Sequence, residues 1–496
     1  MPDPPSTSPG ISLEPGDVSV AALRQAIDSG ALTSADLTAS YLDRITGLNP
    51  DLHAVITVNP AALTEAMARD EARARGVGAG PLDGIPVLVK DNVEVAGMPV
   101  TAGSPALLGS EPGDAFLAGR LRQAGAVIIG KANLSEWANF RSDHSTSGWS
   151  TLGGQAANPC GPGRNPSGSS SGSAVGVAAG LTPLAVGTET DGSIVCPSSA
   201  CGIVGIKPTV GLVSRSGIVP VSLEQDTAGP MALSVADAAA LLTVLAFPDP
   251  ADPASSGSPG GDLDYTAYLD PAGANQARLG VWRAGSAAAD AAITAVLDEA
   301  VARLRACGAT VLDPVELPGG EAIEKPELRA LLHEFKHDIN AYLSKLPGSH
   351  PDTLAELIDY NRRDAGRVLA CFGQEIFEQA EALSGELDDP ERVRARQTAR
   401  QLARAALDGP LAIYRLDAII ALTANPAWLT DYLLGDHDVF HTSTPAAVAG
   451  YPSVTVPTGE VSGLPVGLSF IGPPWSEPTL IALAHAFEQS GSRHRT

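Results

Sequence analysis

The sequence predicts an α/β protein with a central mixed β-sheet, helices covering both faces of that sheet, and a helical insertion. Three observations predict this fold class. Apolar residues make up 44% of the chain, enough for a large folded core. Short apolar runs followed by glycine alternate with amphipathic helical stretches, which is typical of strands buried between helical layers. A long, charge-rich helical stretch at about 320–410 then interrupts this alternation.

The first half of the chain is expected to contain a short arm, three helices and most of the early strands. Residues 1–16 are rich in Pro, Ser and Gly and predict a flexible arm before a single domain at 17–496. Two helices are expected within Val18–Ile45 and one at 60–75. The strands expected next are Ile85–Val89, Ala126–Ile129, Leu184–Val186 and Ile203–Ile206, with helices at Phe116–Ala124, Ser173–Ala179 and Val235–Leu245.

The second half is expected to return to the same alternation after a loop. Residues 247–264 are rich in Pro, Gly, Ser and Asp, which is typical of a surface loop or linker. Two strands, Leu279–Trp282 and Thr310–Leu312, are expected around a helix at 287–306. After the insertion, the apolar runs predict strands at Asp417–Leu422, Ser453–Val456 and Val466–Ile471 and a closing helix at Glu477–Gln489.

The charge and the cysteines exclude several classes of partner. A formal net charge of −24 argues against nucleic acid, which requires clustered Lys and Arg, and against an anionic membrane surface. No apolar run is long enough to span a bilayer, and no leader pattern is visible at the N-terminus. The five cysteines are irregularly spaced without a CxxC pair, so neither a zinc site nor a disulfide framework is expected. We therefore expect a cytoplasmic protein without metal or cofactor; the oligomeric state stays open, with a monomer favoured.

The stretch GPGRNPSGSSSGSA at 161–174 places several serines in a glycine-rich setting. A flexible Ser/Gly linker is the alternative interpretation. Linkers seldom lead straight into a buried helix, however, and an apolar Ala/Val/Gly helix follows here at once. The exposed backbone amides of such a loop-to-helix junction suit the stabilisation of an anion.

Two further stretches indicate acyl-transfer chemistry. GTETDGS at 187–193 follows an apolar strand, and such a turn can direct successive N–H groups at one point, as an oxyanion hole requires. An ordinary polar turn is the alternative. Lys90 ends the apolar run in LDGIPVLVKDN. A lysine at a strand end is usually solvated, but a buried one loses its charge readily and then can act as a base.

Together these stretches resemble the amidase signature. GIPVLVKDN, GSSSGSAVGVAAG, GTETDGSIVCP and CGIVGIKPTVGLVSR occur in the family's order within a core at about 80–240. Outside it, KANLSEWANF, SGWSTLGGQ, STPAAVAGYPSVTVP and GLPVGLSFIGPPWSEPTL look like the peptide amidase branch. The resemblance covers most of the chain and is weakest at 250–410. It implies the amidase-signature fold and a serine-dependent amidase.

The resemblance also assigns roles by position. Ser193 takes the place of the nucleophile, Ser169 that of a bridging serine preceded by a cis peptide bond, and Lys90 that of the base. Asn139 lies in a segment that usually borders the site, and we expect it to contact substrate. The backbone amides that would form the oxyanion hole are those of Thr190, Asp191, Gly192 and Ser193.

Two departures from the common family pattern bear on the substrate. Asp191 stands where the turn usually has Gly, and Val195 where Arg is frequent. The peptide amidase branch shares both features, so a tRNA-dependent amidotransferase component is less expected. The sequence therefore predicts hydrolysis of a carboxamide to carboxylate and ammonia through an acyl-enzyme, on the C-terminal amides of peptides. A general amidase acting on small aliphatic or aryl amides is the alternative.

Two other motifs compete with this interpretation. Gly168-Ser-Ser-Ser-Gly172 fits G-x-S-x-G, with Ser170 as nucleophile and His437 or His441 later in the chain, but no strand is expected before it. The segment 125–131 nearly matches a phosphate-binding loop, yet it has Ala132 in place of Ser or Thr and is expected to be a strand. A non-enzymatic scaffold would leave both serine turns and Lys90 without a purpose.

Overall fold

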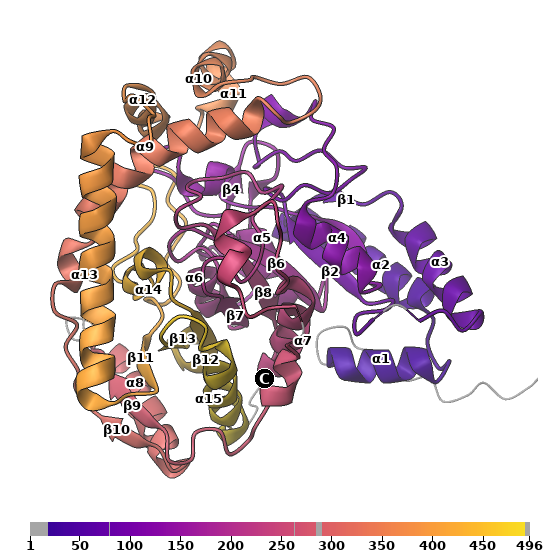
Figure 1. Cartoon of the computed structure of the whole chain (residues 1–496). Helices are drawn as coiled ribbons and strands as arrows, with labels where there is room; N and C mark the ends of the chain where they lie inside the picture. Colours follow the sequence, from indigo (N-terminus) through magenta and orange to yellow (C-terminus); the bar gives the residue numbers. More distant parts are fainter. Residues whose placement is uncertain (1–17, 79, 262, 284–289, 492–496) are drawn as a thin grey trace, which may run out of the picture.

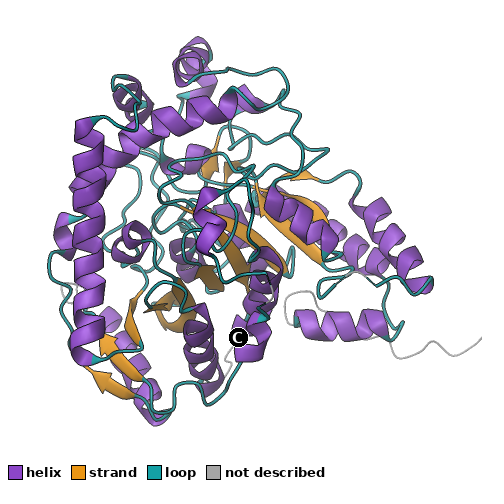
Figure 2. Ribbon diagram, viewed as in Figure 1, coloured by secondary structure: helices purple, strands orange, loops and turns teal. Residues whose placement is uncertain are grey.

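The computed structural model describes residues 18–78, 80–261, 263–283 and 290–491. The arm expected at 1–16 and the start of the helix expected at 287–306 lie outside these ranges. The described residues form an 11-stranded mixed sheet with helices on both of its faces (Figures 1 and 2). The predicted fold class is confirmed.

The strands are ordered β1-β3-β2-β6-β8-β7-β12-β13-β11-β9-β10 across the sheet. β2 runs parallel to β3 and β6, and β9 runs parallel to β10 and β11, whereas the other neighbouring pairs are antiparallel. The strands of this sheet are β1 Val55–Val58, β2 Pro86–Lys90, β3 Val127–Ala132, β6 Leu184–Glu189, β7 Val204–Lys207, β8 Thr227–Ala232, β9 Arg278–Val281, β10 Thr310–Leu312, β11 Ala418–Leu422, β12 Ser453–Val461 and β13 Leu464–Ile471. β4 Trp149–Ser150 and β5 Gly154–Gln155 form a separate two-stranded ribbon.

Two helical layers bury the sheet. One layer contains α4 Phe116–Gln123, α7 Val235–Leu245, α15 Glu477–Ser490 and α8 Ala291–Ala306, which contact one another in that order. The other contains α5 Ser171–Ala178 and α6 Val195–Ala200. Three helices, α1 Val20–Asp28, α2 Ser34–Leu52 and α3 Ala62–Ala74, lie at the β1–β3 end of the sheet (Figure 1). The main apolar core lies between the sheet and these layers.

The insertion is helical, as predicted. Its helices are α9 Glu324–Leu343, α10 Leu354–Arg363, α11 Ala365–Val368, α12 Glu375–Glu381 and α13 Pro390–Tyr414, and α14 Thr444–Ala449 packs against α13. In Figure 1, α13 runs along one side of the molecule and α9 meets it at one end. A second apolar cluster joins Phe335 and Phe377 of the insertion to Trp137 and Val221 of the signature core. No helix of the described ranges is long and apolar enough to span a membrane.

Candidate active site

The candidate site lies where two parallel strands end. β2 ends at Lys90 and β6 ends at Glu189, and their register pairs Val89 with Val186, so both strand ends reach the same edge of the sheet. Ligands of α/β proteins commonly bind outside the carboxyl ends of parallel strands. The serine-rich loop joins this edge because the Ser170 N–H donates to the Ser193 carbonyl oxygen at 3.1 Å.

Lys90 is fully buried among uncharged oxygen atoms. Its Nζ lies 2.8 Å from Ser169 Oγ, 3.0 Å from Ser170 Oγ and 2.9 Å from Thr188 Oγ1. Burial lowers the pKa of Lys90 to about 7, although the charges of Asp226 and Glu189 act in the opposite direction. Near neutral pH a large fraction of Lys90 is therefore unprotonated and can accept a proton from Ser169.

The three neighbouring serines differ in access. Ser169 and Ser170 are fully buried, whereas Ser193 is 8% exposed. The peptide bond between Gly168 and Ser169 is cis, as the resemblance implied. Within the part of the chain that the structure describes, the Ser193 hydroxyl makes no hydrogen bond. Ser193 is thus the serine whose hydroxyl an incoming substrate can reach.

The turn before Ser193 presents unused backbone donors. Among the described residues, the N–H groups of Thr190, Asp191, Gly192 and Ser193 have no hydrogen-bond acceptor. Gly192 and Ser193 are buried, where unpaired N–H groups are rare, so this run of four free donors indicates a place for an external anion or oxyanion. Gly192 has φ +78°, and an added Cβ would lie 2.9 Å from the Cys196 sulfur, so this position requires glycine.

Side chains on both sides hold this turn in place. Glu189 Oε2 accepts hydrogen bonds from the N–H groups of Ile194 and Val195 at 2.7 and 3.0 Å. The Asp191 carboxylate accepts hydrogen bonds from the hydroxyls of Ser443 at 2.5 Å and Thr444 at 2.7 Å. The free amides of the turn are therefore held between β6 and the start of α14.

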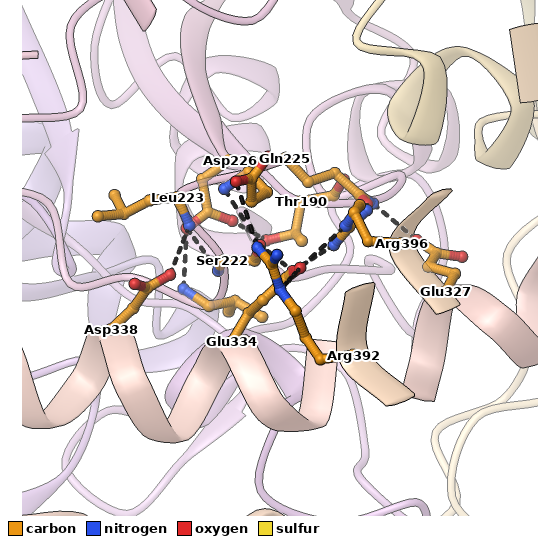
Figure 3. Close-up of polar contacts among 12 residues, drawn as sticks. Thr190, Ser222, Leu223, Gln225, Asp226, Glu327, Glu334, Asp338, Arg392 and Arg396 are labelled. Atoms are coloured by element: carbon orange, nitrogen blue, oxygen red, sulfur yellow. Dashed lines mark hydrogen bonds and ion pairs between the residues drawn. The ribbon is translucent and has the colours of Figure 1, made fainter. Parts of the chain in front are cut away.

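A buried polar network connects the same turn to the insertion (Figure 3). Thr190 Oγ1 donates to Asp226 at 2.5 Å, and the Thr190 carbonyl accepts from Gln225 Nε2 at 2.9 Å. Arg396 of α13 donates to Gln225 Oε1 at 2.7 Å and pairs with Glu334 of α9. The two long helices of the insertion thus support the turn through Gln225, although they do not reach Ser193 themselves.

Burial shifts the acids of this network toward neutral pH. It raises the pKa of Asp226 to about 6, that of Asp338 to about 7 and that of Glu327 to about 8. Shifted acids gather at functional sites, but buried structural networks produce them as well. Since these groups contact the turn and the insertion, their place in the site is one of support.

Asn139 ends a short turn whose backbone is left-handed at Trp137, Ala138 and Asn139. Its Nδ2 donates to Ser147 Oγ at 2.9 Å, and its Oδ1 is buried without a partner among the described residues. The free oxygen leaves Asn139 able to accept a hydrogen bond from an amide. Substrate contact stays a prediction for this residue.

The structure favours neither competing motif. Ser170 caps α5 and donates to the Thr188 carbonyl oxygen, and no strand leads into it within the described loop. Among the described residues neither imidazole bonds Ser170: His437 bonds Asp431, and His441 bonds Asp438 and Thr444. In the phosphate-loop candidate, residues 127–132 form β3, and Lys131 pairs with Asp91.

Sequence reasoning missed three residues near Lys90, namely Thr188, Glu189 and Asp226, and it named Ser170 only as a competing nucleophile. Thr188 and Glu189 lie in the GTETDGS stretch, whose density of polar residues directly after an apolar strand could have pointed to them. Asp226 had no such signal, because it follows an ordinary polar loop.

Several known proteins are similar to this chain. The sequence pattern of the amidase family matches residues 36–481. A probable amidase of Arabidopsis thaliana is 42% identical over 94% of this chain and 89% of its own length. The crystal structure of a peptide amidase from Stenotrophomonas maltophilia superimposes with a TM-score of 0.91 at 49% identity, covering 96% of this chain and 97% of that one.

A component of the glutamyl-tRNA(Gln) amidotransferase of Chloroflexus aurantiacus is also similar, at 35% identity over 96% of this chain and 97% of its own. The family match extends over most of the chain, from α2 to α15. The chain therefore belongs to the amidase-signature family.

Proposed function

We propose that this amidase is a serine hydrolase in which Lys90, Ser169 and Ser193 act as one relay. The observation that carries the proposal is a desolvated lysine 2.8 Å from Ser169, beside a turn with four free N–H groups. A serine hydroxyl is a weak nucleophile until a base takes its proton. Lys90 supplies that base through Ser169.

We propose the following steps for these residues. Ser193 Oγ attacks the carboxamide carbon while its proton passes to Ser169, and Ser169 passes its own proton to Lys90. The oxyanion that forms is held by the N–H groups of residues 190–193. The proton returns through Ser169 to the nitrogen, the C–N bond breaks and ammonia leaves. Water then attacks the acyl-enzyme by the same relay and releases the carboxylate.

We further propose that the substrates are peptides with a C-terminal amide. Similarity to the peptide amidase along nearly the whole chain supports this choice. Asp191 and Val195, the two departures from the common family turn, each lie two residues from Ser193 in the sequence. The free oxygen of Asn139 could accept an N–H of the peptide backbone.

Mass spectrometry of one peptide, presented as the C-terminal amide and as the free acid, tests this function. We expect the amide to be converted to the acid with release of ammonia, the acid to stay intact, and Ser193→Ala protein to convert neither. Fragments from internal cleavage would contradict the proposal. Turnover confined to small aliphatic or aryl amides would instead indicate a general amidase.

A further inference from the structure

A small internal cavity lies beside Ser169. The volume that the centre of a water molecule can occupy in it is about 10 Å³. A cavity that holds one water needs ~10–15 Å³ by this measure. Ser169 lines it together with Asn92, Glu189 and Asp226, whereas Ser193 does not. The cavity therefore borders the bridging serine and, through Thr190, the turn that leads to Ser193, and it has room for one small molecule.

The polar wall of the cavity contains unused acceptors. Asn92 is 4% exposed and donates through Nδ2 to Thr188 Oγ1 at 2.9 Å, which leaves its Oδ1 without a partner among the described residues. Glu189, 1% exposed, likewise has an unpartnered Oε1. Buried polar atoms without partners are rare in folded proteins. An occupant that donates N–H or O–H bonds would satisfy them.

The other wall of the cavity is apolar and fixed. Ala138, Val219 and Val221 line it, and the two valines belong to the apolar cluster that packs against the insertion. The Val221 N–H also donates to Asp226 at 2.8 Å, and the Val219 N–H donates to the Asn92 carbonyl oxygen at 2.8 Å. With its backbone held at both points, this wall has little freedom to widen for a larger occupant.

We propose that this cavity is the leaving-group site and that it receives ammonia. The inference rests on the proposed function, in which Ser169 returns a proton to the nitrogen of the breaking C–N bond. The carbonyl carbon keeps its bond to Ser193 Oγ, the nitrogen takes the bonding pair and the returned proton, and neutral NH₃ enters the space beside Ser169. There its N–H bonds face Asn92. The water that attacks the acyl-enzyme has the same size and can donate in the same way.

The site gives a physical reason for acting on amides and not on peptide bonds. Ammonia has one heavy atom, whereas even methylamine has two, and the second would meet Ala138 or a valine. One methylene of misfit commonly changes kcat/KM by ~10–200-fold. The acyl side of the substrate takes no part in this selection.

The test compares an amide with the N-methylamide of the same peptide. We expect wild-type protein to favour the amide at least tenfold in kcat/KM, and Val221→Ala to raise the N-methylamide/amide ratio about tenfold. Val219→Ala should raise it too and serves if Val221→Ala does not fold. The matched control is Val100→Ala, because Val100 belongs to the same apolar cluster but does not line the cavity; its ratio should equal that of wild type.

Several outcomes would overturn the site: equal turnover of both substrates by wild type, a ratio that neither cavity variant changes, or an equal rise in Val100→Ala. If peptide amides are inert but a small aliphatic amide is hydrolysed, the proposed peptide specificity fails alone. The same ratio, measured on that small amide and its N-methyl form, then decides the leaving-group site. No ammonia from either class would refute both proposals.

Discussion

Lys90 of the signature core and the arginines of the helical insertion are buried in opposite ways. In the core, Lys90 meets only hydroxyl and carbonyl oxygens at hydrogen-bond distance, and burial lowers its pKa. In the insertion, Arg396 and Arg392 pair with Glu334, and Arg400 pairs with Glu224. A desolvated lysine with no carboxylate at hydrogen-bond distance loses its proton readily and is reactive, whereas an arginine paired with a carboxylate is held in place. We therefore expect the core to supply the chemistry and the insertion to supply rigidity.

The largest effect on activity should come from replacing Ser193 in the core. Ser193→Ala removes the nucleophile, and we expect amide hydrolysis to fall by ~10⁴-fold or more. The hydroxyl makes no hydrogen bond with described residues, so the urea midpoint of unfolding should be unchanged. Ammonia release and urea titration measure the two quantities. A folded Ser193→Ala protein with near-normal activity would rule out this nucleophile.

The pH dependence of kcat/KM tests the role of Lys90, the desolvated base. Lys90 must be neutral to accept a proton, and its pKa is about 7. The kcat/KM should therefore rise as pH increases through about 7 and level off above it, because protonation below that pH removes the base. Lys90→Ala and Ser169→Ala should each lose most activity.

His437→Ala is the control for that profile. Among the described residues, His437 bonds to Asp431 alone, near the surface, so the variant should keep both rate and profile. A large loss in His437→Ala or His441→Ala, together with an active Lys90→Ala, would return Ser170 and a histidine base to consideration.

A substitution in the buried network of the insertion should lower the free energy of unfolding. Arg396→Ala leaves Glu334 buried with one cation fewer, and breaking a buried pair costs ~3–5 kcal/mol. Arg362→Ala is the matched control in the same insertion: its side chain is 58% exposed, against 4% for Arg396. Surface pairs such as Arg362–Glu378 contribute ~0–1 kcal/mol. Urea unfolding measures both, and equal losses would show that the network does not stabilise the fold.

The smallest effect should come from the turn Glu136–Asn139 of the core. Asn139→Ala removes a free acceptor, and losing one substrate hydrogen bond costs ~1–3 kcal/mol. We expect kcat/KM to drop about tenfold on peptide amides, with little change on a small aliphatic amide that has no further backbone to contact. Steady-state kinetics on both substrates measure this. An equal drop on both would mean that Asn139 shapes the site without contacting the peptide.

Most of the sheet could be predicted because its strands are buried on both faces. Continuous apolar runs led to β2 at nearly its observed bounds and to the first half of β6. β8 was missed because Thr227–Ala232 contains Gly229 and Pro230, which argue against a strand although the whole segment is buried here. β1 was missed because its four residues are partly exposed and carry no clear alternation.

The candidate site was predictable only where its residues lie in local motifs. The stretches around Lys90, Ser169 and Ser193 each have a recognisable setting in sequence. Arg396 does not: it lies on a charged helix that suggests a solvated face, and its partner Gln225 is 171 residues away. Contacts of this separation depend on how the helices pack against the core, which local patterns do not specify.

The place of β12 in the sheet has a consequence for how the protein is made. The first six strands of the sheet order come from the first half of the chain and end at β7, whose free edge pairs only with β12. A ribosome reaches Ser453 roughly 250 residues after Lys207, on the order of ten to fifty seconds later. Throughout that interval the nascent chain presents an unpaired, apolar strand edge, the surface at which half-made chains join one another. Early release or C-terminal truncation should therefore yield aggregates rather than a smaller folded enzyme.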